Sequence, residues 1–135
     1  SPPILSASAV EAAVDNSLEA GIKNIRDKSV ELTSYLVYLF DKVLAPAGFS
    51  LGTPRPPERR GSHISLRHPE AYRINRALIE EMKVIPDFRE PDIIRLGLSP
   101  LYNSFADVWK LTDRVRRVVE EKRYENYSPE RLPVT

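Results

Sequence analysis

The chain has 135 residues, 41% of them hydrophobic and 29% charged, with 20 basic and 19 acidic side chains and therefore a net charge of +1. This length suits a single hydrophobic core, and the composition is typical of a globular protein rather than a disordered or membrane-spanning one. The balanced charge and the lack of cysteine exclude a whole-chain attraction to polyanions, disulfides and sulfur-ligated metal sites, so we expect a cytoplasmic protein with neither nucleic acid nor membrane as a partner.

The N-terminal third is predicted to be helical. Residues 6–44 contain no proline and a single glycine, Gly21, so we expect a helix over this stretch with a break near the glycine. Two neighbouring rows of apolar residues repeat every three or four positions between Ile22 and Leu44. Because these rows make an apolar face wider than one packed side requires, the helix should be covered on more than one side.

Short strands and two further helices are predicted after Pro46. The strands are expected at residues 49–53, 62–67, 84–88 and 93–98, one helix follows His68 and extends to Met82, and Ser104 with Asp107 opens the last helix. This order indicates an α+β fold in which long N-terminal helices precede a small, mainly antiparallel sheet covered by helices on one face. Beyond about Lys122 the periodicity ends, and a mobile or loosely docked tail is expected.

Most polar clusters favour structural roles. His63 and His68 lie five positions apart across a strand end, so they point to opposite faces and should not share a metal ion. Arg55, Arg59 and Arg60 stand in a loop without the interleaved aromatic residues that stack on bases, which argues against nucleic acid. The six lysines fall on polar helix faces or at helix ends, and no nucleophile, base and orienting acid can be grouped into a catalytic site.

Arg95 is the strongest candidate for a binding residue. In its strand the apolar neighbours share one face, whereas Arg95 lies on the other face beside Gly97, which leaves open space. An arginine in so apolar a strand needs an anion or solvent. Two interpretations stay open: an internal salt bridge to Asp87 or Asp92, or a fork of parallel hydrogen bonds that binds a ligand carboxylate.

Several stretches, taken in order, carry a resemblance to a known family. They are residues 1–5, 27–36, 52–55, 60–66, 84–89 and 94–108, the last reading Ile-Arg-Leu-Gly-Leu-Ser-Pro-Leu-Tyr-Asn-Ser-Phe-Ala-Asp-Val. Together they resemble the C-terminal part of the kynureninases, pyridoxal-phosphate enzymes of the aspartate-aminotransferase fold type. The similarity runs from residue 1 to about residue 118, and the last stretch is the most specific.

The resemblance implies a homodimeric enzyme that hydrolyses L-kynurenine, or 3-hydroxykynurenine, to the anthranilate and L-alanine. In that family the arginine before the Ser-Pro-Leu-Tyr turn pairs with the α-carboxylate of the substrate, which gives Arg95 the substrate-binding role. The polar residue before Pro-Pro lies near the phosphate of the cofactor, which gives Ser1 a cofactor-binding role.

The resemblance also implies what this segment lacks. The family holds pyridoxal 5'-phosphate through a lysine in an earlier large domain, and those stretches do not occur here. We therefore expect linking helices at 1–45, the small domain at 46–121 and a polar tail at 122–135, with no catalytic residue, no bound cofactor and no metal in the segment alone. A free-standing ligand-binding or interaction domain without catalysis, and the small domain of a related aminotransferase or desulfurase, stay open as alternatives.

Overall fold

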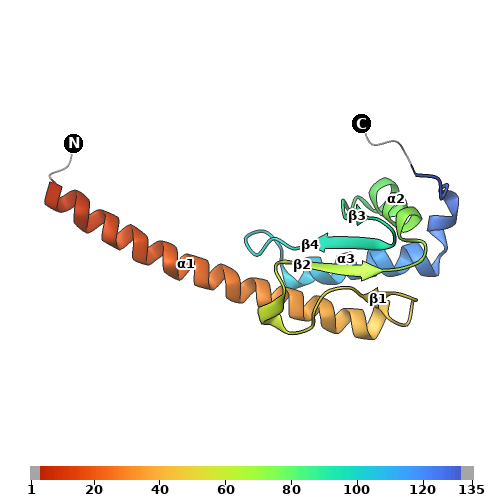
Figure 1. Cartoon of the computed structure of the whole chain (residues 1–135), viewed down its shortest axis with the longest axis horizontal. Coiled ribbons are helices and arrows are strands. Elements are labelled where there is room, and N and C mark those ends of the chain that lie inside the picture. The colour runs from red at the N-terminus through yellow and green to blue at the C-terminus, as the bar shows by residue number, and fades with distance from the viewer. Residues whose placement is uncertain (1–3, 132–135) are drawn as a thin grey trace.

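Three helices and four strands make up the computed structural model, which describes the backbone of residues 4–131 and the side chains of residues 18–131 (Figure 1). The helices are α1 (Ile4–Leu39), α2 (Ala71–Met82) and α3 (Phe105–Glu120), and the strands are β1 (Ser50–Leu51), β2 (His63–Arg67), β3 (Asp87–Arg89) and β4 (Ile93–Gly97). A π-helical turn at Phe40–Leu44 extends α1, and 3-10 turns lie at Pro57–Arg59 and Arg123–Asn126. The α+β class predicted from the sequence is confirmed.

The helix α1 continues through Gly21, so the predicted break there is wrong. A glycine in an exposed helix is less favourable than alanine by about 1 kcal/mol, which is too little to end a helix that has no proline. Figure 1 shows the N-terminal half of α1 extending beyond the rest of the molecule, and Ile22 on it is 66% exposed. The coverage on more than one side predicted from the two apolar rows is therefore not found at this end. No helix of the described residues combines the length and hydrophobicity that crossing a bilayer requires.

The sheet has the order β1-β2-β4-β3, and each neighbouring pair is antiparallel. Ile64 and Leu66 of β2 lie beside Leu96 and Ile94 of β4, and all four are buried against the helices. Leu32 and Leu36 of α1 and Val108, Val115 and Val118 of α3 complete this core. Alternation along β2 and β4 thus buries one face of the sheet and leaves the other polar.

Two predicted strands are displaced or shorter in the structure. The stretch 84–88 does not form a strand from its start, because pairing begins only at Asp87. Pro86 has no N–H to donate to a neighbouring strand, which explains this late start. The strand expected at 49–53 is reduced to the two residues of β1. One further backbone bond follows it, in which the Gly52 N–H donates to the Ser65 carbonyl at 2.8 Å.

The start of α3 is capped as the sequence predicts. The Ser104 hydroxyl accepts a hydrogen bond from the Asp107 N–H at 3.2 Å, and the Asp107 carboxylate accepts one from the Ser104 N–H at 2.9 Å. These bonds to the Ser104 backbone and side chain lower the pKa of the Asp107 carboxyl. The reciprocal pair satisfies two N–H groups that a helix end leaves open, and so fixes where α3 begins.

The segment after α3 contacts α2. The Arg73 Nε donates to the Tyr127 carbonyl at 2.8 Å, and the Tyr127 hydroxyl donates to Glu81 at 2.8 Å. This contact with a carboxylate raises the pKa of the Tyr127 hydroxyl. The mobility expected for 122–135 and the division of the chain into three parts stay predictions, but these bonds attach Tyr127 of the tail to α2.

Candidate functional site

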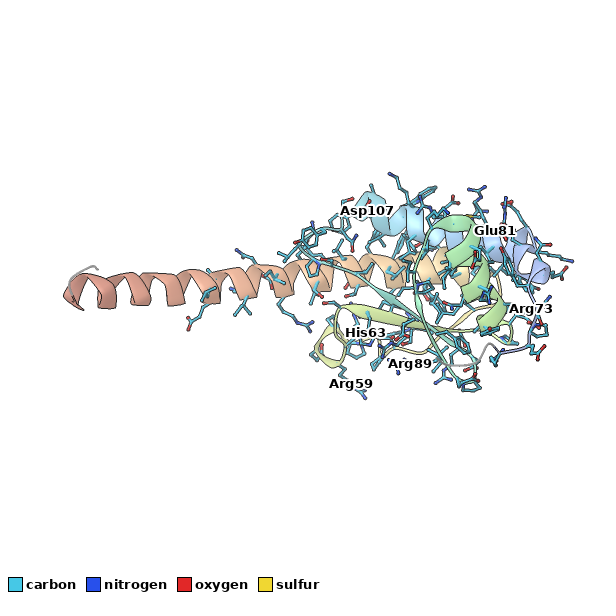
Figure 2. All side chains as sticks on the ribbon, turned by 90° about the horizontal axis from the view of Figure 1, so that it is seen from above. Arg59, His63, Arg73, Glu81, Arg89 and Asp107 are labelled. Carbon is cyan, nitrogen blue, oxygen red and sulfur yellow. The ribbon has the colours of Figure 1, made fainter. Side chains whose placement is uncertain are left out.

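The face of the sheet turned away from the helices is polar, and we call it the open face. It consists of His63, Ser65 and Arg67 of β2, Ile93, Arg95 and Gly97 of β4, and Asp87 and Arg89 of β3, which pair across the strands. Figure 2 shows His63 and Arg89 on this side of the sheet, opposite Asp107 of α3. Strand alternation fixes which residues reach this face. Because β4 lies between β2 and β3, a residue on it has paired backbone on both sides.

Arg95 lies at the centre of the open face, between Ser65 on one side and Asp87 on the other. Its Nη2 forms a salt bridge with the Asp87 Oδ2 at 3.0 Å, and its side chain is 37% exposed. Its Nε is buried and has no hydrogen-bond partner within the described residues. At Gly97, two residues along, no atom lies within 4 Å of the place a Cβ would take. The guanidinium is therefore paired on one nitrogen and has space beside it.

The salt bridge that the sequence left as one of two interpretations is present, and Asp87 rather than Asp92 provides it. Asp92 pairs instead with Arg67 at 3.1 Å. Since the remaining nitrogens of Arg95 are not taken up by Asp87, this salt bridge does not exclude the second interpretation, the binding of a ligand carboxylate. The geometry is therefore compatible with both interpretations.

Asp87 is shared by two arginines, a feature that sequence reasoning missed. The Arg89 Nε donates to the same Asp87 Oδ2 at 3.0 Å. The signal that could have found it is the spacing of two between Asp87 and Arg89, which places both on the face of β3 that Arg95 shares. With Arg67 and Asp92 included, three arginines meet two aspartates on this face, so it carries an excess of positive charge that attracts an anion.

A cavity of about 400 Å³ lies beside the end of β4. It is lined by Gly97 and Leu98 at the strand end, by Lys83, Val84 and Ile85 after α2, and by Asn103, Asp107, Lys110, Leu111 and Arg114 at and along α3. This volume is within the range of small-molecule sites. Arg95 does not line the cavity, and Gly97 is the residue that the cavity and the open face have in common.

The arginine-rich loop binds the protein itself. Arg55 pairs with both oxygens of Asp41 at 3.0 and 2.8 Å, and this contact lowers the pKa of Asp41 and raises that of Arg55. Arg60 is buried and donates to Thr33, Ser34 and the Arg55 carbonyl. Burial, assisted by the charge of Arg26, lowers the pKa of Arg60. Only Arg59 of the three loop arginines points freely outward among the described contacts, which is a poor surface for a polyanion.

The two histidines do not converge. His63 is exposed on the open face, whereas His68 packs with ring centroids 5.0 Å from Phe49 and 6.3 Å from Tyr124. The His68 Nδ1 accepts a hydrogen bond from the Glu70 N–H at 2.9 Å, and burial lowers the pKa of this histidine. Within residues 18–131, no group of three or more potential ligands could hold a metal ion.

The residues considered for a cofactor do not form a site in the described structure. Ser1, to which the resemblance gave a cofactor-binding role, lies outside the described residues. All six lysines of the chain are exposed or partly exposed, and Lys28 lies over the ring of Phe105 at 5.2 Å. A lysine that binds an aldehyde cofactor covalently is normally enclosed and desolvated, so the described residues do not fit pyridoxal phosphate.

Comparison with known proteins gives a consistent result. The family model described as the kynureninase C-terminal domain matches residues 25–115. The kynureninase of Geobacillus thermodenitrificans strain NG80-2 is 44% identical over 130 residues, which cover 96% of this chain and 30% of the relative. That of Shouchella clausii strain KSM-K16 is 45% identical over 113 residues (84% and 26%), and that of Bacillus thuringiensis subsp. konkukian strain 97-27 is 37% identical over 130 residues (96% and 30%). The chain thus spans about 30% of the length of the curated relatives it matches.

Proposed function

Because the chain belongs to the kynureninase C-terminal domain family, we propose that it works as the C-terminal domain of a kynureninase and that Arg95 binds the α-carboxylate of the substrate. The reaction in this proposal is the hydrolysis of L-kynurenine, or of its 3-hydroxy derivative, to the anthranilate and L-alanine. A cytoplasmic homodimer is part of the same proposal. The cofactor, pyridoxal phosphate, would be held by residues outside the described ones, and Arg95 would act on the substrate alone.

The observation that carries the proposal is the state of the Arg95 guanidinium. It stands on a central strand in a face with excess positive charge, it is paired with the described residues through one nitrogen only, and it has open space at Gly97. A planar guanidinium binds a carboxylate through two parallel hydrogen bonds and so fixes its orientation as well as its position.

In the proposed hydrolysis, Arg95 must fix the orientation of the substrate. A substrate bound by one end can rotate, whereas a substrate whose carboxylate plane is fixed presents the bond to be broken in one direction only. Arg95 is suited to this because β2 and β3 hold its backbone on both sides. A strand in the middle of a sheet moves less than a loop, so the Arg95 side chain keeps its position between turnovers.

A chimera tests the proposal directly. The matched 130-residue segment of the Geobacillus thermodenitrificans kynureninase is replaced by the corresponding residues of this chain. We expect the chimera to hydrolyse L-kynurenine, with anthranilate followed by its fluorescence. A folded chimera that binds the cofactor but leaves kynurenine intact would favour the free-standing binding domain. Transamination or cysteine desulfuration without kynurenine hydrolysis would favour one of the related enzymes.

A further inference from the structure

We propose that Asp87 is a positioning residue, which holds the Arg95 guanidinium so that its outer edge is free to receive a carboxylate. This inference rests on the proposed function of Arg95 as the carboxylate-binding residue. It assigns to Asp87 an action through Arg95 rather than a contact with the substrate.

The strand register places Asp87 where it can do this. Asp87 of β3 stands directly opposite Arg95 of β4 in an antiparallel pair, and Ser65 of β2 stands opposite Arg95 on the other side. Side chains directly opposite each other on neighbouring strands are close enough to interact. Since the carboxylate lies on the β3 side alone, it draws the guanidinium toward β3 and away from Ser65.

The donors of Arg95 are divided by this arrangement. The Nη2 forms an ion pair with the Asp87 Oδ2 at 3.0 Å, while the Nε is buried and cannot meet a ligand from solvent. An arginine has five N–H donors, of which two lie on each terminal nitrogen and one on Nε. The nitrogens that a ligand can reach are therefore Nη1 and Nη2, which form the end-on fork that suits a carboxylate.

Arg89 keeps Asp87 from competing with the ligand. A carboxylate paired with Arg95 alone would neutralise it and weaken its attraction for a second carboxylate. Here the Asp87 Oδ2 also accepts from the Arg89 Nε at 3.0 Å, so one negative charge faces two positive ones. The group of three keeps a net positive charge while Asp87 still restrains the Arg95 side chain.

The same contacts separate a positioning role from a structural one. The side chain of Asp87 is 49% exposed, and exposed ion pairs contribute little to stability. Replacing Asp87 should therefore leave the fold intact and change only how Arg95 is held. Asp92 provides a matched control, because it also pairs with an arginine of the open face, Arg67 at 3.1 Å, and does not touch Arg95 in the described structure.

The test uses the chimera defined above and two competitive inhibitors that share the aromatic ketone of kynurenine and differ only in the α-carboxylate. Asp87→Asn and Asp87→Ser should weaken the carboxylate-bearing inhibitor on the order of tenfold and the other inhibitor less than about twofold. Asp92→Asn should change neither. In an Arg95→Lys background, Asp87→Asn should not weaken the carboxylate-bearing inhibitor further, because the guanidinium that Asp87 positions has been removed. Equal weakening of both inhibitors, or of neither, by the Asp87 variants would overturn the inference.

Two further results keep the inference apart from the proposed function. If Arg95→Ala weakens the binding of both inhibitors equally, Arg95 does not bind the carboxylate, and the proposed role of Asp87 is wrong as well. If Arg95→Ala is selective and Asp87→Asn is not, only the role of Asp87 is wrong. The Arg95 Nε–H signal in the NMR spectrum of the 135-residue chain gives a second measurement. Its exchange with water should be slow in the unchanged chain and in Asp92→Asn but fast in Asp87→Asn, and slow exchange in all three would contradict the proposal.

Discussion

The buried side chain of Arg60 is expected to attach the proline-rich loop to α1, and Arg60→Met tests this. Methionine keeps an unbranched apolar stem in the same space and removes the guanidinium. Three hydrogen bonds are lost: the one from Nε to the Thr33 hydroxyl at 3.2 Å, the one from Nη2 to the Ser34 hydroxyl at 2.7 Å, and the one from Nη1 to the Arg55 carbonyl.

Two opposing effects decide the magnitude. Each hydrogen bond from a charged donor contributes about 1.5–3 kcal/mol, but removing a buried charge also relieves its desolvation, and replacement of buried ions by apolar residues is often close to neutral. Ser34 is exposed and can bind water instead, and the Thr33 hydroxyl keeps its bond to the Ser29 carbonyl at 2.8 Å. The lost hydrogen bonds should outweigh this relief, because the favourable interaction of Arg60 with the charge of Glu58 is lost together with them. We expect a loss of about 2 kcal/mol in the free energy of unfolding.

Urea denaturation of the 135-residue chain measures this loss, and the melting temperature should fall by about 7 °C, from an unfolding entropy of about 2.1 cal/mol/K per residue. Arg59→Met is the matched control, because Arg59 is adjacent and exposed. Its effect should stay within about 0.5 kcal/mol. If Arg60→Met proves as stable as this control or more stable, the guanidinium does not hold the loop and the reasoning is refuted.

Three further results are expected from the same chain. Ser104→Ala should lower the free energy of unfolding by about 1 kcal/mol in urea denaturation because it removes the cap of α3, and an unchanged value would contradict the capping role. Burial holds the pKa of His68 below 6.5, so the unfolded chain binds a proton where the folded chain does not, and stability should fall as the pH drops from about 7.5 to about 5.5; His68→Gln should reduce this slope and His63→Gln should not. Exposed Leu18, Ile22 and Ile25 on the projecting part of α1 should make the chain self-associate in sedimentation equilibrium, and Ile22→Glu should shift it to monomer, whereas a monomer at all concentrations without the substitution would refute this.

Local rules predicted the parts of the fold that depend on neighbouring residues. The cap formed by Ser104 and Asp107 and the alternation that separates Arg95 from Ile94 follow from spacing alone, and both are present. The break at Gly21 was wrong because a helix without proline continues through one glycine at moderate cost. The strand at 84–88 was wrong at its start because Pro86 delays pairing, an effect of the backbone donor rather than of side-chain polarity.

The site could be predicted only in part, because its chemistry depends on contacts across strands. The sequence singled out Arg95 and named Asp87 as one of two alternative partners. That Asp87 and not Asp92 reaches it depends on the register that sets Asp87 opposite Arg95. The sharing of Asp87 with Arg89 and the buried Nε of Arg95 also depend on this register, which no local pattern determines.

The central claim is that Arg95 binds the carboxylate of the substrate, and the steady-state kinetics of the chimera test it most directly. Arg95→Ala should lower kcat/KM for L-kynurenine about 150-fold, while the absorbance of the bound cofactor stays normal. This factor corresponds to a loss of about 3 kcal/mol in transition-state stabilisation. The kcat/KM of Arg95→Lys should lie between those of Arg95→Ala and the unchanged chimera, since an ammonium keeps the charge but loses the paired donors. A kcat/KM near that of the unchanged chimera in Arg95→Ala would show that the salt bridge to Asp87 is the whole role of this arginine.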